Sequence, residues 1–314
     1  MSFLQSLIAP PALQKGDSVM FVAPSRAVAG AHELETARKT FEQWGLQVIY
    51  APHVLAQHFQ QAGTDVQRLS DLQNALDNEQ IRAIICIRGG YGMSRIIDDL
   101  NFEQFAKSPK WLVGFSDITL LINHLNNLGF QAIHGTMPKL FGVEGGTFAE
   151  ESLRMTLFGE KVNYKIPSNE HNSQGQARGI LVGGNLCMLC HSIGSASEIV
   201  TENRILFLEE IGEDLYKIDR FFWQLRRSGK LKNLGGLIIG DFSGIPPEIG
   251  TPFGVTVAEI VASHTAHSNF PVVHNFPVGH CPQNWAMRTG ALVSLSVTSE
   301  EVILNFDESK TFLA

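Results

Sequence analysis

Short apolar runs and helix-periodic segments alternate along the first half of the chain. Between the runs, apolar residues recur at helical spacing over residues 31–44, after Asp65 and after Asp117. This alternation predicts an α/β fold with an open, mostly parallel sheet flanked by helices. The apolar runs, which have the length of strands buried on both faces, are residues 18–23, 46–50, 82–87, 111–115 and 131–134.

The second half of the chain mixes strand-like runs with fewer helical segments. An irregular stretch near residues 145–178 includes the turn-rich residues 167–175, which are typical of a linker. We therefore expect an N-terminal α/β domain over residues 1–145, a linker over 146–175, and a smaller, β-rich mixed C-terminal domain over 176–314. Strands are expected at 204–208, 235–239, 272–275, 291–297 and 302–306, and helices at 185–193, 215–227 and 255–263.

Composition narrows the class of protein. The chain has 314 residues, 44% hydrophobic and 18% charged, which is typical of a folded globular protein. Its 24 basic and 31 acidic residues give a net charge of −7 without a basic run, which argues against a nucleic-acid or membrane partner. No signal peptide is apparent at the start of the chain, and no apolar stretch is long enough to span a membrane. We expect a cytoplasmic protein.

The four cysteines are too few for a disulfide scaffold in a chain of this length. Cys187 and Cys190 form a C-x-x-C motif followed by His191, which also occurs in redox and zinc sites. The motif lies in an apolar stretch, and no second motif supplies further ligands. The sequence therefore predicts buried cysteines, with no metal and no cofactor.

The sharpest local signal is Ser116, within the tetrapeptide GFSD at residues 114–117. An apolar strand leads directly into the serine, and a helix begins on the next residue. This is the pattern of a nucleophile elbow, although Ile118 occupies the position of the final glycine. A serine that only caps the helix fits the same pattern.

A serine nucleophile needs a base, and the base needs an orienting carboxylate. Of the 11 histidines, His280 stands out because it lies on a turn rich in glycine and proline just after a strand. Glu209 and Glu210 follow an apolar strand, and neighbours in a strand point to opposite faces. One of these two glutamates is thus able to face a site while the other faces away.

Residues 88–92 (RGGYG) follow the third predicted strand and contain three glycines in four positions. They fail the dinucleotide-binding pattern, because Arg95 stands at its last glycine position. Close approach of the backbone to a ligand still explains such glycines, and an oxyanion-hole donor meets that requirement as well as a phosphate cradle does.

Taken together, these motifs resemble the LD-carboxypeptidase family of serine peptidases, which includes muramoyltetrapeptide carboxypeptidases. The resemblance extends over nearly the whole chain. It rests on residues 15–17 (KGD), 22–25 (VAPS), 88–92, 114–117, 134–135 (HG), 183–186 (GGNL), 208–213 (LEEIGE) and 277–280 (PVGH). This sequence differs from the family pattern at two positions: it has Glu210 where Asp is more usual, and Thr136 where Pro is more usual.

The resemblance implies specific roles. Ser116 would be the nucleophile, His280 the general base and Glu209 the acid that orients it, with the backbone N–H groups of Gly90 and Asp117 forming the oxyanion hole. The implied site lies between the two domains, and the implied reaction removes the terminal D-alanine from a murein tetrapeptide in cell-wall recycling. Arg88 is the candidate partner for the substrate carboxylate, because a guanidinium binds a carboxylate in a bidentate manner.

Two other functions stay open at this point. Some relatives are microcin-immunity peptidases that cleave a carboxamide bond in an aminoacyl-nucleotide toxin. The absence of tryptophan from residues 145–178 argues against that substrate, because no aromatic platform for the base is evident there. The other alternative is a non-catalytic peptide-binding protein, which would not require Ser116, Glu209 and His280 together. A small peptide is the expected partner in the main interpretation, and a homodimer is the expected assembly.

Overall fold

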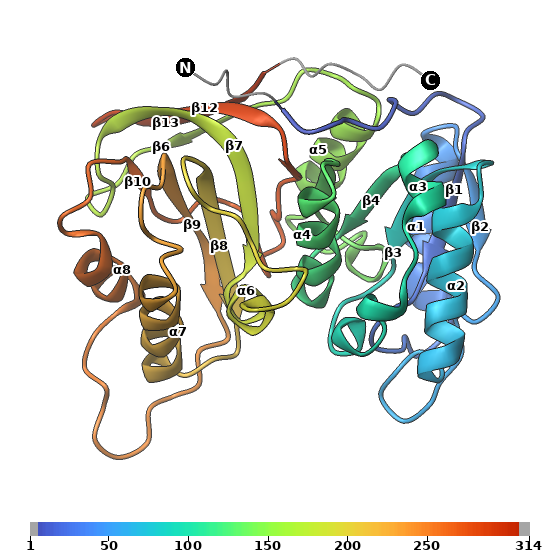
Figure 1. The fold of residues 1–314 in the computed structure, drawn as a ribbon, viewed down its shortest axis with the longest axis horizontal. Helices are drawn as coiled ribbons and strands as arrows, with labels where there is room; N and C mark the ends of the chain where they lie inside the picture. The colour runs from blue at the N-terminus through green and yellow to red at the C-terminus, as the bar shows by residue number, and fades with distance from the viewer. Residues whose placement is uncertain (1–5, 308–314) are drawn as a thin grey trace.

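The first of two β-sheets is built from the N-terminal half of the chain. The structure, a computed structural model, describes residues 6–307. Six strands follow the order β11-β5-β4-β3-β1-β2 (Figure 1). All neighbours run parallel except β11, which pairs antiparallel with β5. The expected mostly parallel sheet is confirmed. Its strands are β1 (Ser18–Val22), β2 (Gln47–Tyr50), β3 (Ile81–Cys86), β4 (Trp111–Gly114), β5 (Ala132–His134) and β11 (Met287–Thr289).

Helices flank this sheet, and short 3-10 turns lie in several of its loops. The capping box of α2, in which Thr64 and Gln67 satisfy each other's backbone N–H groups, shows how the sequence starts one of them. The helices are α1 (Glu35–Gln43), α2 (Asp65–Asp77), α3 (Glu103–Lys107), α4 (Thr119–Asn127) and α5 (Thr147–Leu157). The 3-10 turns are η1 (Ala31–Leu34), η2 (Met93–Arg95), η3 (Ile97–Asp99), η4 (Ser116–Ile118) and η5 (Pro138–Leu140).

The second sheet has seven strands in the order β10-β9-β8-β7-β12-β13-β6. Strands β7 to β10 run parallel, and β12, β13 and β6 continue the sheet in antiparallel fashion, so this half is mixed as expected. Its strands are β6 (Asn163–Pro167), β7 (Gly175–Asn185), β8 (Ile205–Ile211), β9 (Gly236–Ser243), β10 (Val272–Val273), β12 (Leu292–Val297) and β13 (Glu301–Phe306). Its helices are α6 (Leu186–Ser192), α7 (Leu215–Arg227) and α8 (Val257–Thr265).

The expectation that residues 145–178 are irregular is wrong, because this stretch holds α5, β6 and the first residues of β7. Tyr164 on β6 is only 1% exposed, and its hydroxyl donates a hydrogen bond to the Ala286 carbonyl, 2.7 Å away. Residues 168–174 between β6 and β7 do form a loop, in agreement with their turn-rich composition.

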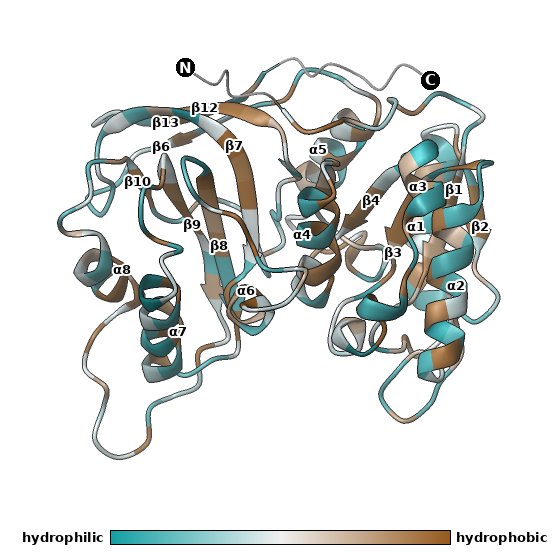
Figure 2. Cartoon of the chain, viewed as in Figure 1, coloured by the Kyte–Doolittle hydropathy of each residue, from teal (hydrophilic) through white to brown (hydrophobic). Residues whose placement is uncertain are grey.

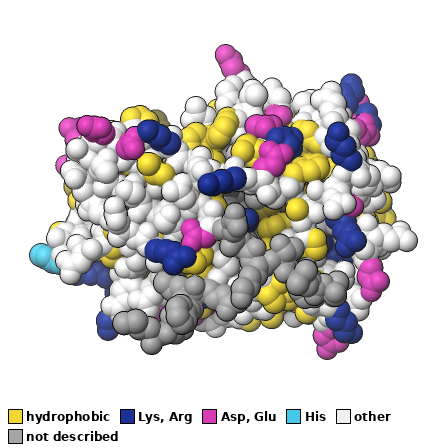
Figure 3. Space-filling view, turned by 90° about the horizontal axis from the view of Figure 1, so that it is seen from above, with side chains coloured by type: hydrophobic (Ala, Val, Ile, Leu, Met, Phe, Trp, Pro, Cys, Tyr) yellow, Lys and Arg dark blue, Asp and Glu magenta, His cyan; other side chains and the backbone are white. Residues whose placement is uncertain are grey.

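Apolar side chains fill the space around both sheets. Figure 2 shows hydrophobic strands in the interior and hydrophilic outward faces on the helices. Helix α4 packs against both β5 and β7, so it lies between the two sheets (Figure 1). Acidic and basic side chains are interspersed over the face shown in Figure 3. No helix within residues 6–307 combines the length and the apolar character needed to cross a bilayer.

Candidate active site

Ser116 lies at the carboxyl end of β4, where the chain turns abruptly into η4. Its φ of 62° places a non-glycine residue in the left-handed region, which costs about 1–2 kcal/mol. Gly89 makes room for this turn: a Cβ built on Gly89 would lie 2.9 Å from Ser116 Cβ and 3.1 Å from its Oγ. A strained serine in close contact with a glycine loop is the arrangement expected of a nucleophile elbow.

Glu209 and His280 form a close pair in the second half of the chain. The Nδ1 atom of His280 lies 2.6 Å from Oε2 of Glu209, and Glu209 is 0% exposed. A carboxylate at this distance accepts the Nδ1 proton, which leaves Nε2 as the proton acceptor of the neutral ring. The Glu209–His280 pair is thus oriented as a general base requires.

The pKa of His280 reflects two opposing influences. Burial lowers it, but the hydrogen bond and charge of Glu209, together with the charges of Glu210 and Asp241, outweigh burial and raise the pKa above its usual value. The imidazolium formed during proton transfer is therefore stabilised by the carboxylate.

Glu210 faces away from Glu209, as the strand alternation predicted. Its carboxylate accepts hydrogen bonds from Asn185 Nδ2 at 2.9 Å and from the Cys187 N–H at 2.7 Å, so it anchors the start of α6. Burial raises the pKa of Glu210 to about 7 despite these bonds. Both glutamates lie within β8 rather than beyond its end, which corrects the predicted end of that strand.

The two halves of the site meet at Phe115. This ring, next to Ser116 in the chain, packs edge-on against the His280 ring with centroids 4.8 Å apart. Phe115 also contacts His134 at the end of β5, whose pKa burial lowers to about 3. Within residues 6–307 no hydrogen bond joins Ser116 to His280. The structure brings these residues to one location through Phe115, without a direct hydrogen bond between the serine and the histidine.

Asp117 has its side chain buried beneath the elbow. Its carboxylate accepts hydrogen bonds from Ser25 Oγ at 2.5 Å and from the Met93 N–H at 2.9 Å, and burial raises its pKa. These bonds connect the loops that follow β1, β3 and β4. The Asp117 N–H lies in the first turn of a helix, where N–H groups have no intrahelical acceptor. Within the described residues 6–307 it has no hydrogen-bond acceptor outside its own turn.

Gly90 lies next to Gly89, in the loop after β3, with a φ of 117°. Its N–H donates to no acceptor within residues 6–307. Arg88, in the same loop, is half-buried and donates from Nη1 to the Ala27 carbonyl at 2.6 Å. An N–H group of the Arg88 guanidinium is therefore already used to hold the loop after β1.

Two supporting residues were not identified from the sequence. Ser25 lies in the loop after β1, and nothing in the sequence shows that it bonds to Asp117. Asn284 accepts a hydrogen bond from the Gly279 N–H at 2.9 Å and so fixes the turn that carries His280. No local sequence pattern signals this bond.

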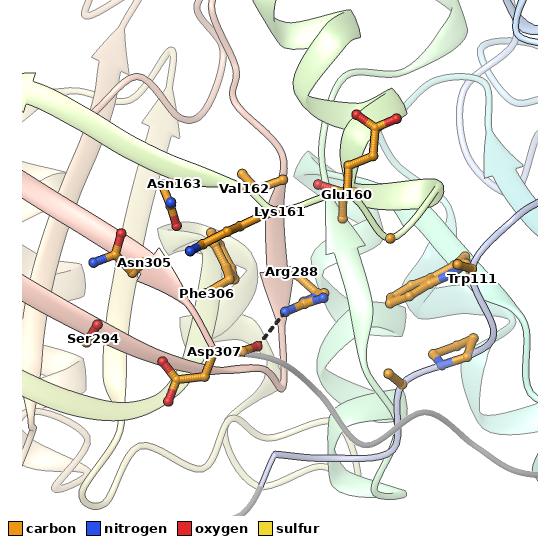
Figure 4. Close-up of a pocket in the computed structure, with 15 residues that line it drawn as sticks. Trp111, Glu160, Lys161, Val162, Asn163, Arg288, Ser294, Asn305, Phe306 and Asp307 are labelled. Carbon is orange, nitrogen blue, oxygen red and sulfur yellow. Dashed lines mark hydrogen bonds between the residues drawn. The ribbon is translucent and has the colours of Figure 1, made fainter.

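The remaining candidates are the cysteine motif and a separate cavity. Cys187 and Cys190 are free thiols on α6, and burial raises their pKa values to about 11 and about 12. A cavity of about 930 Å³ is lined by residues including Trp111, Lys161 and Arg288 (Figure 4). Trp111 is the first residue of β4, so this cavity lies at the opposite end of that strand from Ser116.

A strained serine at a strand–helix junction, near a buried glutamate–histidine pair, defines the class of hydrolases that work through an activated nucleophile. The chain belongs to the LD-carboxypeptidase family: residues 19–135 match its N-terminal domain and residues 178–295 its C-terminal domain. It is therefore a peptidase, as the motifs indicated.

The chain is similar in sequence and in structure to individual proteins of this family. The murein tetrapeptide carboxypeptidase of Pseudomonas aeruginosa is 32% identical over 284 residues, covering 87% of this chain and 91% of that protein. The crystal structure of muramoyltetrapeptide carboxypeptidase from Oxalobacter formigenes matches with a TM-score of 0.84 at 27% identity, covering 94% of this chain and 100% of that one. A microcin self-immunity protein in complex with aspartyl sulfamoyl adenosine shares the fold, with a TM-score of 0.84 at 18% identity over 97% of this chain and 99% of that one.

Proposed function

We propose that this protein is a serine-type LD-carboxypeptidase that removes the terminal D-alanine from murein tetrapeptide. The observation that carries the proposal is the buried Glu209–His280 pair, 2.6 Å between Oε2 and Nδ1, which lies near the strained Ser116. The names of the relatives supply the substrate.

In the proposed reaction, Ser116 Oγ attacks the carbonyl carbon of the bond between the third residue and D-alanine. His280 Nε2 takes the hydroxyl proton, and Glu209 stabilises the imidazolium. The N–H groups of Gly90 and Asp117 bind the oxyanion. His280 then gives its proton to the amine of D-alanine, which leaves as the tetrahedral intermediate collapses to an acyl-enzyme.

Water completes the cycle. His280 removes a proton from the water molecule, the hydroxide attacks the acyl carbon, and the Ser116 alcohol is regenerated together with the murein tripeptide. Residues of this chain account for each step. Arg88, in the same loop as Gly90, and Arg26, whose stem packs against Gly90, make this side of the site positively charged, which favours binding of the substrate's terminal carboxylate.

In this proposal each half of the chain contributes different catalytic groups. Residues 1–145 carry the nucleophile and the oxyanion donors, residues 176–314 carry the acid and the base, and residues 146–175 connect them. A cytoplasmic location, a role in cell-wall recycling and a homodimeric assembly stay predictions.

The test is a competition assay on purified protein, read by liquid chromatography. We expect the murein tetrapeptide ending in D-alanine to be cleaved in preference to its L-alanine epimer and to the pentapeptide, by about a thousandfold for the epimer, because a misplaced carboxylate leaves a cation unpaired. An aminoacyl sulfamoyl-adenylate should be a poor substrate. Faster cleavage of the adenylate would refute the murein substrate and leave the serine mechanism standing.

A further inference from the structure

Basic side chains surround the loops that follow β1, β3 and β5, and most of them already have acceptors. Arg68 and Arg95 both bind Asp65, at 2.6 and 2.5 Å, and Lys139 binds Glu33. Arg88 donates to the Ala27 carbonyl at 2.6 Å. These four cations are committed to holding the loops in place.

Arg26 differs from these four. It is exposed, and its guanidinium makes no hydrogen bond or ion pair with any residue between 6 and 307. Its backbone is nevertheless fixed, because its N–H donates to the Gly89 carbonyl at 3.3 Å and it forms a β-bridge with Gln61. The backbone of Arg26 is thus held in place at this edge of the sheet, while its guanidinium remains available to bind an anion.

The stem of Arg26 lies against Gly90. A Cβ built on Gly90 would lie 2.6 Å from Arg26 Cβ and 3.2 Å from its Cδ. The preceding residue, Gly89, touches Ser116 in the same way, and the two glycine Cα atoms are about 3.8 Å apart because they are consecutive. Arg26 is therefore separated from the nucleophile only by the glycine loop.

A second positive charge lies close by. The pKa of Arg88 is lowered by burial and, in addition, by the charge of Arg26. The nearby carboxylate of Glu33 does not neutralise this pair fully, because it also binds Lys139 and the Ala29 N–H. An anion bound beside Gly90 would relieve the repulsion between the two arginines.

We propose that Arg26 binds the terminal carboxylate of the peptide substrate, while Arg88 positions the Ala27 loop. This inference rests on the proposed function and names the group that makes the enzyme a carboxypeptidase. In a peptide, the terminal carboxylate carbon is three bonds from the carbonyl carbon that Ser116 attacks, so a cation beside the oxyanion donor Gly90 lies within its reach. A guanidinium binds such a carboxylate with two parallel hydrogen bonds.

The experiment compares two substrates, murein tetrapeptide ending in D-alanine and the same peptide ending in D-alaninamide, which lacks the negative charge. Arg26→Met should lower kcat/KM about 10- to 100-fold on the acid and change it by less than about threefold on the amide. Arg26→Lys should restore part of the activity on the acid. Arg95→Met is the matched control, because it removes a cation that Asp65 already binds, and it should not discriminate between the substrates.

Each outcome has a distinct meaning. Equal losses on both substrates, or no loss on the acid, would overturn the role of Arg26 while the proposed function stands. The same discrimination in Arg95→Met would show that net charge alone is responsible, which also overturns the contact. If the wild-type enzyme cleaves neither peptide before its last residue, the proposed function itself fails, and the role of Arg26 fails with it. Circular dichroism melting curves verify that each variant is folded.

Discussion

Gly279, the residue before His280, lies in contact with Glu209 and permits a decisive mutation. Its φ is 120°, a conformation that side chains rarely adopt, and a Cβ built there would lie 2.6 Å from Glu209 Cβ and 3.0 Å from Oε2. Oε2 is the atom that binds His280. An alanine at this position must therefore move either the turn or the carboxylate.

Two contributions set the expected magnitude for Gly279→Ala. The positive φ costs about 1–3 kcal/mol for a residue with a side chain, and forcing a methyl group into a packed interior costs about 1–3 kcal/mol more. We expect the free energy of unfolding to fall by the sum of the two, about 2–6 kcal/mol. Because the histidine loses its orientation, kcat should fall by up to about 10⁴-fold, the loss seen when the orienting acid of a serine hydrolase is replaced.

Gly229→Ala is the matched control. Gly229 has a φ of 79°, and nothing lies within 4 Å of a Cβ built there, so this variant carries the backbone strain without the collision. It should lose about 1–2 kcal/mol and keep full activity. Urea unfolding followed by tryptophan fluorescence, together with D-alanine release, measures both variants. A Gly279→Ala enzyme as stable and as active as Gly229→Ala would refute the reasoning.

Three further predictions concern the chemistry. Ser116→Ala should abolish turnover and leave the melting temperature nearly unchanged, whereas near wild-type hydrolysis would show that the nucleophile is misassigned. His280 must be neutral to accept a proton, and its pKa is raised, so kcat/KM should increase with pH through an apparent pKa above 6.5. Glu209→Gln removes the negative charge that raises this pKa, so it should shift the increase in kcat/KM to lower pH. A pH profile that is flat, or that the substitution does not move, would contradict a histidine base. EDTA should leave activity unchanged, and a loss that zinc restores would favour a metal site at Cys187 and Cys190 instead.

The five parallel strands of the first sheet could be predicted from the sequence, because each is a short, mostly apolar run closed by polar or glycine residues. The antiparallel strand β11 was not predicted. The turn at Ser116 was indicated by a strand that leads directly into a serine and then a helix, although a simple helix cap fits that pattern too. The alternation of Glu209 and Glu210 followed from strand geometry alone.

Strand β7 escaped prediction because several glycines interrupt its apolar pattern, and glycine is depleted in strands. The structure supplies the reason for two of them. A Cβ on Gly183 would lie 2.0 Å from the Phe207 carbonyl oxygen, and one on Gly184 would lie 2.6 Å from Thr119. Contacts between segments so far apart in the chain leave no local trace in the sequence.

The contact between Ser25 and Asp117 and the uncommitted charge of Arg26 were equally hidden. Both depend on which loops share an edge of the sheet and on which acids other cations already occupy. A sequence pattern shows residue types and spacing, but it does not show how acceptors are distributed among competing donors.

Strand β11 has a mechanical consequence for the enzyme. It follows His280 by only a few residues, yet Met287 pairs with His134 in the first sheet, and the Gly290 N–H donates to the Leu181 carbonyl in β7. One segment is therefore hydrogen-bonded into both sheets. A hinge rotation that separates the halves would break these main-chain hydrogen bonds. We therefore expect the substrate to enter through movements of side chains and loops. The same main-chain hydrogen bonds couple the unfolding of the two halves. We therefore expect a single calorimetric unfolding peak, with neither half melting separately.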